Sequence, residues 1–352
     1  MRSIWVGAVF AFACRGTAPA PAPTDQPSAT TSITPSAIAS DVFWHDDGAL
    51  MVDIDGNGVT DLVGRATDAK KRFAIVAIDG ASGRLRWRTP TPQPAWKPMT
   101  ALWNGVVVSK HENDQLVGID VKTGALRWTS PHPEHLDWFC SRRSMLVGYI
   151  SIGSPTTTIV AIDVATGSIG PQEDDRGGPD CGPVIHDHER GDPSSVPWGS
   201  DPFEPSLESI QLWSVPDSKE YLRVYVLGDE TFVERATAAR SEWKTPLPIP
   251  EGFTATEPTR TAIGPDTICV TIHHTGPGYR ATLTCLDLAT GAKRWALEGL
   301  TIDSTYIANE RLYVLTTNRI GAYDVHTGKH LWDVGCPADQ TFIGCATPDP
   351  SP

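Results

Sequence analysis

The segment Ile119-Asp120-Val121-Lys122-Thr123-Gly124-Ala125-Leu126-Arg127-Trp128 carries the pattern that decides the fold of this chain. An aspartate is followed by threonine or serine three residues later, by glycine in the next position and, further on, by tryptophan. The Asp-x-x-Ser/Thr-Gly part occurs five times, beginning at Asp79, Asp120, Asp163, Asp287 and Asp324. Self-similarity of this kind is typical of repeat architectures.

Each copy predicts two short strands joined by a tight turn. The run before the aspartate is rich in Val and Ile and suits a buried strand. The aspartate can accept hydrogen bonds from backbone N–H groups of the turn, and glycine supplies the positive φ of its last position. Four copies carry a tryptophan eight residues after the aspartate, which we expect to pack against the neighbouring unit, and the third copy has Pro171 there. These tryptophans are Trp87, Trp128, Trp295 and Trp332.

The spacing of the copies predicts an all-β propeller. Neighbouring aspartates lie 41, 43 and 37 residues apart (79 to 120, 120 to 163 and 287 to 324), and a unit of about 40–45 residues with four strands is typical of a propeller blade. Between Asp163 and Asp287, residues 221–227, 231–235 and Trp243 form a worn copy without the Asp or Gly. We therefore expect one propeller of six four-stranded antiparallel blades over residues 41–346.

Two parts of this prediction stay open or irregular. Residues 42–44 and 340–345 could add a seventh blade. Residues 171–205 are crowded with Pro, Gly and Asp and predict an insertion loop within the propeller.

The copies at Asp120 and Asp287 resemble the tryptophan-docking repeats of PQQ-like β-propellers, and the resemblance covers residues 49–334. This family includes quinoprotein alcohol dehydrogenases and the lipoprotein scaffold of the outer-membrane β-barrel assembly machinery. The docking residues are structural, so the resemblance implies the fold rather than a quinone cofactor.

The amino terminus predicts export. Residues 4–13 are apolar and follow Arg2, a stretch that is too short for a membrane-spanning helix and suits a signal peptide over residues 1–14. The placement of Cys14 resembles a bacterial lipobox, in which the cysteine carries the lipid, although Ala11 and Phe12 depart from that pattern. Plain signal-peptidase cleavage is the alternative. Residues 15–40 predict a disordered Ala/Pro/Ser/Thr tether and residues 347–352 a disordered tail. We expect an outer membrane lipoprotein that faces the periplasm or the cell surface.

The remaining six cysteines indicate disulfides in an exported chain. Proximity favours Cys269–Cys285 and Cys336–Cys345, with Cys140–Cys181 as the remaining pair, but six cysteines allow fifteen pairings, and buried thiols are the alternative. The net charge of −13 disfavours nucleic acid and anionic lipid surfaces as partners.

One segment has the chemistry of a metal site. Residues 53–62 place oxygen ligands at Asp53, Asp55, Asn57 and Asp61, with the backbone carbonyl of Val59 between them. Ca²⁺ prefers such oxygen ligands, six to eight of them. The segment lacks the Glu and the helices of an EF-hand and resembles the calcium hairpins of FG-GAP propeller blades. We expect a structural calcium site, and an Asp/Gly-rich turn without metal is the alternative.

Other candidate sites have weaker support. His186 and His188 in the expected insertion loop could bind a transition metal, but no third ligand is identifiable, and a solvated acidic loop is favoured. No nucleophile elbow, phosphate-binding loop or dinucleotide fingerprint is present.

We therefore expect a non-catalytic propeller that presents its loops to an envelope protein or an extended ligand. A PQQ-dependent dehydrogenase is one alternative, disfavoured by the few blades and by the absence of adjacent cysteines. A polysaccharide-binding module is another. It would use loop aromatics, which are Trp96, Trp103, Trp138 and Trp198.

Overall fold

All residues described below belong to one compact unit, residues 37–352. The structure is a computed structural model. It describes residues 43–44, 49–68, 70–93, 100–112, 115–133, 136–142, 145–150, 157–175, 185–186, 195–199, 210–214, 220–227, 230–237, 240–247, 249, 254–276, 280–300, 302–316 and 319–335. The predicted signal peptide, Cys14, the predicted tether and the predicted tail lie outside these ranges.

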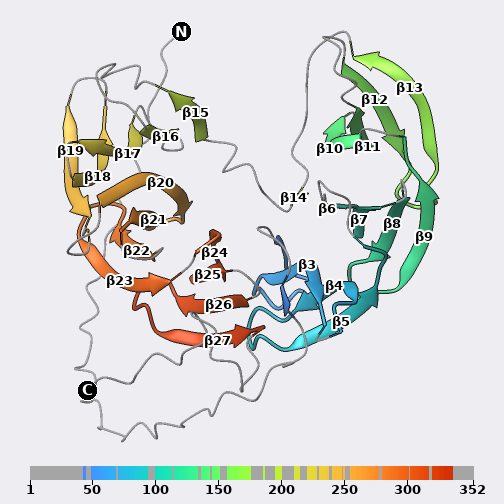
Figure 1. The fold of residues 1–352 in the computed structure, drawn as a ribbon, viewed down its shortest axis with the longest axis horizontal. Coiled ribbons are helices and arrows are strands. Elements are labelled where there is room, and N and C mark those ends of the chain that lie inside the picture. The colour runs from blue at the N-terminus through green and yellow to red at the C-terminus, as the bar shows by residue number, and fades with distance from the viewer. Residues whose placement is uncertain are drawn as a thin grey trace, which may run out of the picture. The chain divides into compact units, whose positions relative to one another are not determined.

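The described residues form six antiparallel sheets of successive strands, which are labelled in Figure 1. The first sheet contains β1 (Phe43–Trp44), β2 (Leu50–Val52), β3 (Asp61–Thr67), β4 (Phe73–Ile78) and β5 (Leu85–Pro90). The second contains β6 (Thr100–Trp103), β7 (Val106–His111), β8 (Gln115–Asp120) and β9 (Leu126–Pro131), and the third β10 (Leu136–Arg142), β11 (Met145–Ile150), β12 (Thr157–Ile162) and β13 (Ile169–Asp175).

The fourth sheet contains β15 (Ser195–Gly199), β16 (Ile210–Ser214), β17 (Tyr221–Leu227), β18 (Glu230–Ala236) and β19 (Ser241–Leu247). The fifth contains β20 (Thr254–Ile263), β21 (Thr267–Thr275), β22 (Arg280–Asp287) and β23 (Lys293–Leu300), and the sixth β24 (Ser304–Ala308), β25 (Arg311–Thr316), β26 (Arg319–Asp324) and β27 (His330–Val334). The short strand β14 (Ile185–His186) pairs with β6. Six sheets of this kind confirm the predicted all-β propeller. No helix among the described residues is long and apolar enough to cross a membrane.

The hydrophobic cores lie between consecutive sheets, which explains why the strand before each aspartate is apolar without interruption. Successive side chains of a strand point to opposite faces. In β4, Val76 and Ile78 pack with residues of the sixth sheet, whereas Ile75 and Ala77 pack with residues of the second sheet. Both faces of β4 are buried, so neither face selects for polar residues.

Further clusters join the second sheet to the third, the fourth to the fifth and the fifth to the sixth. Together with the first sheet's contacts to the second and to the sixth, they join the last sheet to the first and link every pair of neighbouring sheets except the third and fourth. Among the described residues no hydrophobic cluster spans the third and fourth sheets. In Figure 1 the sixth sheet lies beside the first, as these contacts require.

The worn copy forms regular strands. Residues 221–227 and 231–235 lie in β17 and β18, and Trp243 lies in β19. Phe43–Trp44, one of the two segments considered for a seventh blade, pairs instead with β3 of the first sheet. The other segment, residues 340–345, lies outside the described residues. Within the expected insertion at 171–205 the structure describes the end of β13 together with β14 and β15.

Candidate functional site

The repeated tryptophans bind the next sheet through one recurring hydrogen bond. The indole N–H of Trp87 donates to the carbonyl oxygen of Val121 at 2.9 Å, and that of Trp128 donates to the carbonyl oxygen of Val164 at 2.7 Å. In both cases the acceptor is the residue directly after the motif aspartate of the next copy. Trp295 donates to Val325 and Trp332 to Gly80 in the same way, so all four predicted docking tryptophans bridge two sheets.

A fifth tryptophan docks as well. Trp243 of the worn copy donates to the carbonyl oxygen of Leu288 at 3.2 Å, although its own copy lacks the Asp and Gly. Among the described residues no tryptophan makes this contact between the third and fourth sheets. Two sequence features explain the difference, because Pro171 replaces the tryptophan of the third copy and the worn copy offers no Asp-Gly turn to receive one.

The motif glycines are required for two reasons. Gly124 has a φ of +70°, which only glycine adopts without strain. A Cβ added to it would lie 2.7 Å from the ring of Trp87. The turn therefore forms the surface on which the indole of the preceding sheet rests.

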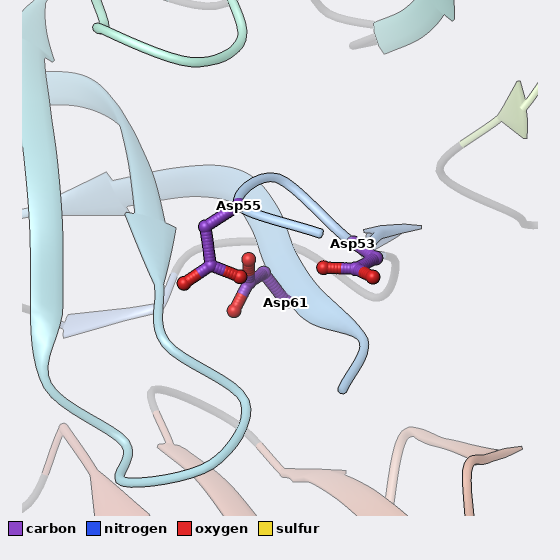
Figure 2. Close-up of side chains that lie close together, drawn as sticks. All are labelled: Asp53, Asp55 and Asp61. Atoms are coloured by element: carbon purple, nitrogen blue, oxygen red, sulfur yellow. The ribbon is translucent and has the colours of Figure 1, made fainter. Parts of the chain in front are cut away.

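The residues predicted to bind calcium lie in the hairpin between β2 and β3, here called the acidic hairpin (residues 53–61). One carboxylate oxygen from each of Asp53, Asp55 and Asp61 lies within 4.8 Å of the others, and Figure 2 shows the three side chains gathered there. Hard oxygen donors at this spacing fit Ca²⁺. Asp53 and Asp55 are exposed, whereas Asp61 is fully buried.

Two of the predicted ligands, Asp53 and Asn57, also hold the hairpin itself. Asp53 accepts hydrogen bonds from the backbone N–H groups of Gly56, Asn57 and Gly58. Asn57 accepts one from the backbone N–H of Val59 through its side-chain oxygen. The hairpin is thus folded by its own polar groups.

The acidic hairpin has a cationic partner that the sequence did not predict. Arg86 of β5 lies 2.7 Å from Asp55, 3.1 Å from Asp61 and 2.6 Å from Asp79. A hydrogen bond from Arg86 lowers the pKa of Asp55, whereas burial raises the pKa of Asp61. An arginine also stands immediately before the tryptophan in two other copies, as Arg127 and Arg294. This recurrence was the sequence signal that could have pointed to Arg86 as a partner of the carboxylates.

The acidic hairpin also contacts the sixth sheet. The side-chain amide of Asn309 donates to the carbonyl oxygen of Gly58 at 2.8 Å and to the hydroxyl of Thr60 at 2.9 Å. The hydroxyl of Tyr313 donates to the carbonyl oxygen of Thr60 at 2.9 Å, and burial raises the pKa of this tyrosine to about 12. The hairpin therefore lies where the last sheet meets the first.

The predicted disulfide Cys269–Cys285 is present, between directly paired residues of β21 and β22. Cys140 is buried in β10. Cys181, Cys336 and Cys345 lie outside the described residues, so the other two pairings stay predictions.

The remaining candidates lie mostly in strands or outside the described part of the chain. His186 is in β14, and His188 lies outside the described residues. Among the proposed loop aromatics, Trp103 is not in a loop but ends β6, where it packs against the core between the second and third sheets. Trp138 and Trp198 also belong to strands, β10 and β15. Trp96 lies outside the described residues.

Comparison with known proteins identifies the family. Residues 63–177 and 211–347 match the family described as outer membrane protein assembly factor BamB. The chain belongs to this family. The matched ranges contain all five docking tryptophans, whereas the carboxylates of the acidic hairpin precede them.

Similar solved structures include BamB from Moraxella catarrhalis, with 13% identity over 83% of this chain and 78% of that chain and a TM-score of 0.27. A europium-containing methanol dehydrogenase has 13% identity over 83% and 78%, with a TM-score of 0.35. Quinohemoprotein alcohol dehydrogenase from Comamonas testosteroni has 11% identity over 84% and 68%, with a TM-score of 0.38. At these values the likeness carries no argument about activity. No curated protein sequence matches the chain.

Proposed function

We propose that this chain is an exported, non-catalytic interaction module that serves the assembly of outer membrane proteins. The observation that carries the proposal is the family match over residues 63–177 and 211–347, because the family is described as an assembly factor. A rigid series of docked sheets suits this role, since its loops can vary while the tryptophan contacts fix the framework. The partner is an envelope protein.

Crosslinking in intact cells tests this role. The full chain is tagged at its carboxyl end and expressed in a bacterium with an outer membrane, and the crosslinked proteins are identified. We expect a component of outer membrane protein assembly to be captured by the wild-type chain and lost with the Trp332→Ala variant, which removes a docking contact. Capture of no such component rejects the role. Dye reduction with alcohols after reconstitution with PQQ and calcium would instead establish the quinone enzyme.

We further propose that the chain is anchored at the envelope through a lipid on Cys14, since this cysteine follows an apolar stretch of signal-peptide length. Cys14→Ser should move the protein from the membrane fraction to the soluble periplasmic fraction and abolish labelling by a radioactive fatty acid. Unchanged fractionation of Cys14→Ser would reject the anchor.

The acidic hairpin is proposed as a structural calcium site. The three clustered carboxylates supply hard oxygen ligands, and the hairpin contacts the sixth sheet through Asn309 and Tyr313. Bound calcium would neutralise part of the negative charge and hold these carboxylates together. We expect a higher melting temperature in millimolar calcium than in chelator, and no such difference in the Asp53→Asn variant. Equal melting temperatures for the wild-type chain reject the site.

A further inference from the structure

A cavity of about 590 Å³ lies where the acidic hairpin meets the sixth sheet. Gly58 and Val59 of the hairpin line it, together with residues of the sixth sheet. These residues are Asn309, Glu310, Arg311, Asp324 and Leu331. Comparison with the sister copies within the same chain indicates what this cavity binds.

In three copies an arginine occupies the position seven residues after the motif aspartate and binds its carboxylate. Arg86 lies 2.6 Å from Asp79, and Arg294 lies 2.8 Å from Asp287. Arg127 makes the same ion pair with Asp120. In the sixth sheet this position is Leu331, so Asp324 receives no arginine from its own copy.

The fifth sheet shows that the arginine can bridge two carboxylates. The guanidinium of Arg294 contacts Asp287 and also Asp266, which lies in the turn between β20 and β21, at 3.0 Å. The sixth sheet has a turn at the same position, with one hydrogen bond in common. The backbone N–H of Leu288 donates to the carbonyl oxygen of Asp266, as that of Val325 donates to Glu310, and both donors follow a motif aspartate.

Glu310 is therefore the positional equivalent of Asp266. The two carboxylates that hold Arg294 in the fifth sheet correspond to Glu310 and Asp324 in the sixth, and both of these line the cavity. Leucine stands in the place of the bridging arginine. The sixth sheet thus keeps both acidic groups of an arginine-binding arrangement without its own arginine.

The backbone at Glu310 has an unusual conformation for a glutamate. Glu310 has a φ of +62°, in the left-handed region that disfavours residues other than glycine. Its equivalent in the second sheet is Gly105, whose carbonyl oxygen accepts the matching hydrogen bond from Val121 and whose φ is +75°. The sixth sheet therefore carries a carboxylate where the second sheet has a glycine.

The carboxylates that line the cavity are available to a cation. Asp324 accepts hydrogen bonds from the backbone of His326 and from the backbone and hydroxyl of Thr327, all through Oδ1. None of the hydrogen bonds described for Asp324 uses Oδ2. Arg311 also lines the cavity, but its guanidinium donates to the carbonyl oxygen of Gly80, and among the described ion pairs it has none with Asp324 or Glu310.

We propose that this cavity binds an arginine side chain of a protein partner, between Glu310 and Asp324, in the place that the chain's own arginine fills in the fifth sheet. A guanidinium fits two carboxylates better than an ammonium because it presents several N–H donors in one plane. Leu331 and Val59 provide apolar surface for the stem of the arginine. This inference rests on the proposed interaction function and names the chemistry that the partner must present.

A titration with a short arginine peptide tests the cavity directly. The probe is acetyl-Gly-Gly-Arg-Gly-Gly-amide, and the matched probe contains citrulline, which is neutral and has nearly the same shape. NMR signals of the Leu331 methyl groups should shift with the arginine peptide and saturate at millimolar concentration. They should not shift with the citrulline peptide, and binding of both peptides alike would overturn the proposal.

Three variants separate binding from folding. Leu331→Arg supplies the missing arginine, so the chain should stay folded and lose peptide binding. Glu310→Gly should relieve the backbone strain and yet weaken binding at least tenfold. Asp163→Asn alters an equivalent turn that has no seventh-position arginine and should leave binding unchanged. Undiminished binding by Leu331→Arg, or saturation of the same signals by calcium alone at lower concentration, would overturn the proposal.

The crosslinking experiment distinguishes this inference from the proposed function. If Leu331→Arg still captures the assembly component, the interaction function stands and the cavity is not its site. If the wild-type chain binds the arginine peptide but captures no assembly component, the cavity stands as an arginine site and the assembly role fails.

Discussion

The indole N–H of Trp332 lies 3.1 Å from the carbonyl oxygen of Gly80, which precedes it by 252 residues. This hydrogen bond joins the last strand to the first sheet, and the aromatic ring of Trp332 rests on Gly83 of the same turn. The seam between these sheets also carries the acidic hairpin and the cavity. Closure of the sheets and the candidate sites therefore depend on the same contacts.

Replacement of Trp332 should destabilise the whole propeller. Trp332→Ala should lower the free energy of unfolding by about 3–5 kcal/mol, the range for buried aromatic residues, measured by urea unfolding. Trp332→Phe keeps most of the packing and loses the hydrogen bond, which contributes about 1 kcal/mol. The matched control is Trp103→Phe, since the half-buried Trp103 packs against a core without a docking bond among the described contacts. Equal effects of the two phenylalanine variants would contradict a role for the bond.

Gly105 and Gly124 of the second sheet allow backbone strain to be separated from crowding. Gly105 has a φ of +75° and no atom within 4 Å of an added Cβ, so Gly105→Ala should lose only about 1–2 kcal/mol of stability from left-handed strain. Gly124→Ala suffers the same strain and also a clash with Trp87 at 2.7 Å. We expect it to lose about 1–3 kcal/mol more, from overpacking. Thermal unfolding of both variants measures the difference, and equal losses would show that the indole can move aside.

Stability should depend on pH through the arginine–aspartate pairs. The hydrogen bond from Arg294 lowers the pKa of Asp287 to about 2 and also lowers the pKa of Asp266. Because these values are depressed in the folded state, the stabilisation is complete above the ordinary carboxyl pKa and is lost as the pH falls toward 2. Arg294→Met should therefore be less stable than wild type near neutral pH, and the difference should shrink in acid. Urea unfolding across this pH range measures the difference, and a pH-independent difference would mean that Arg294 acts through packing alone.

Arg86 should compete with calcium at the acidic hairpin. Its guanidinium contacts both Asp55 and Asp61, which are proposed calcium ligands. The positive charge of Arg86 would therefore repel a calcium ion bound to these carboxylates. Arg86→Gln should melt at a lower temperature in chelator but gain more from added calcium than the wild-type chain. The calcium-dependent shift in melting temperature is the measurement, with Arg127→Gln as the control, since Arg127 pairs with Asp120 in the second sheet. An unchanged shift would place calcium away from Arg86.

The sequence determined the propeller, because its signals are local. Each Asp-x-x-Ser/Thr-Gly turn forms from hydrogen bonds within five residues, as at Asp287, which accepts hydrogen bonds from the backbone N–H and the hydroxyl of Thr290. The apolar runs, the docking tryptophans and the Cys269–Cys285 pair follow from the same short-range pattern. These features could be predicted from the sequence because each depends on residues that lie close together in the chain.

The tertiary structure alone decided what meets at the seams. Arg86 lies among three carboxylates, Asn309 contacts Gly58 from 251 residues away, and Glu310 lines a cavity with Val59. The last two of these contacts join segments from opposite ends of the sequence. Their geometry is set by how the first and sixth sheets pack, and no local spacing encodes it.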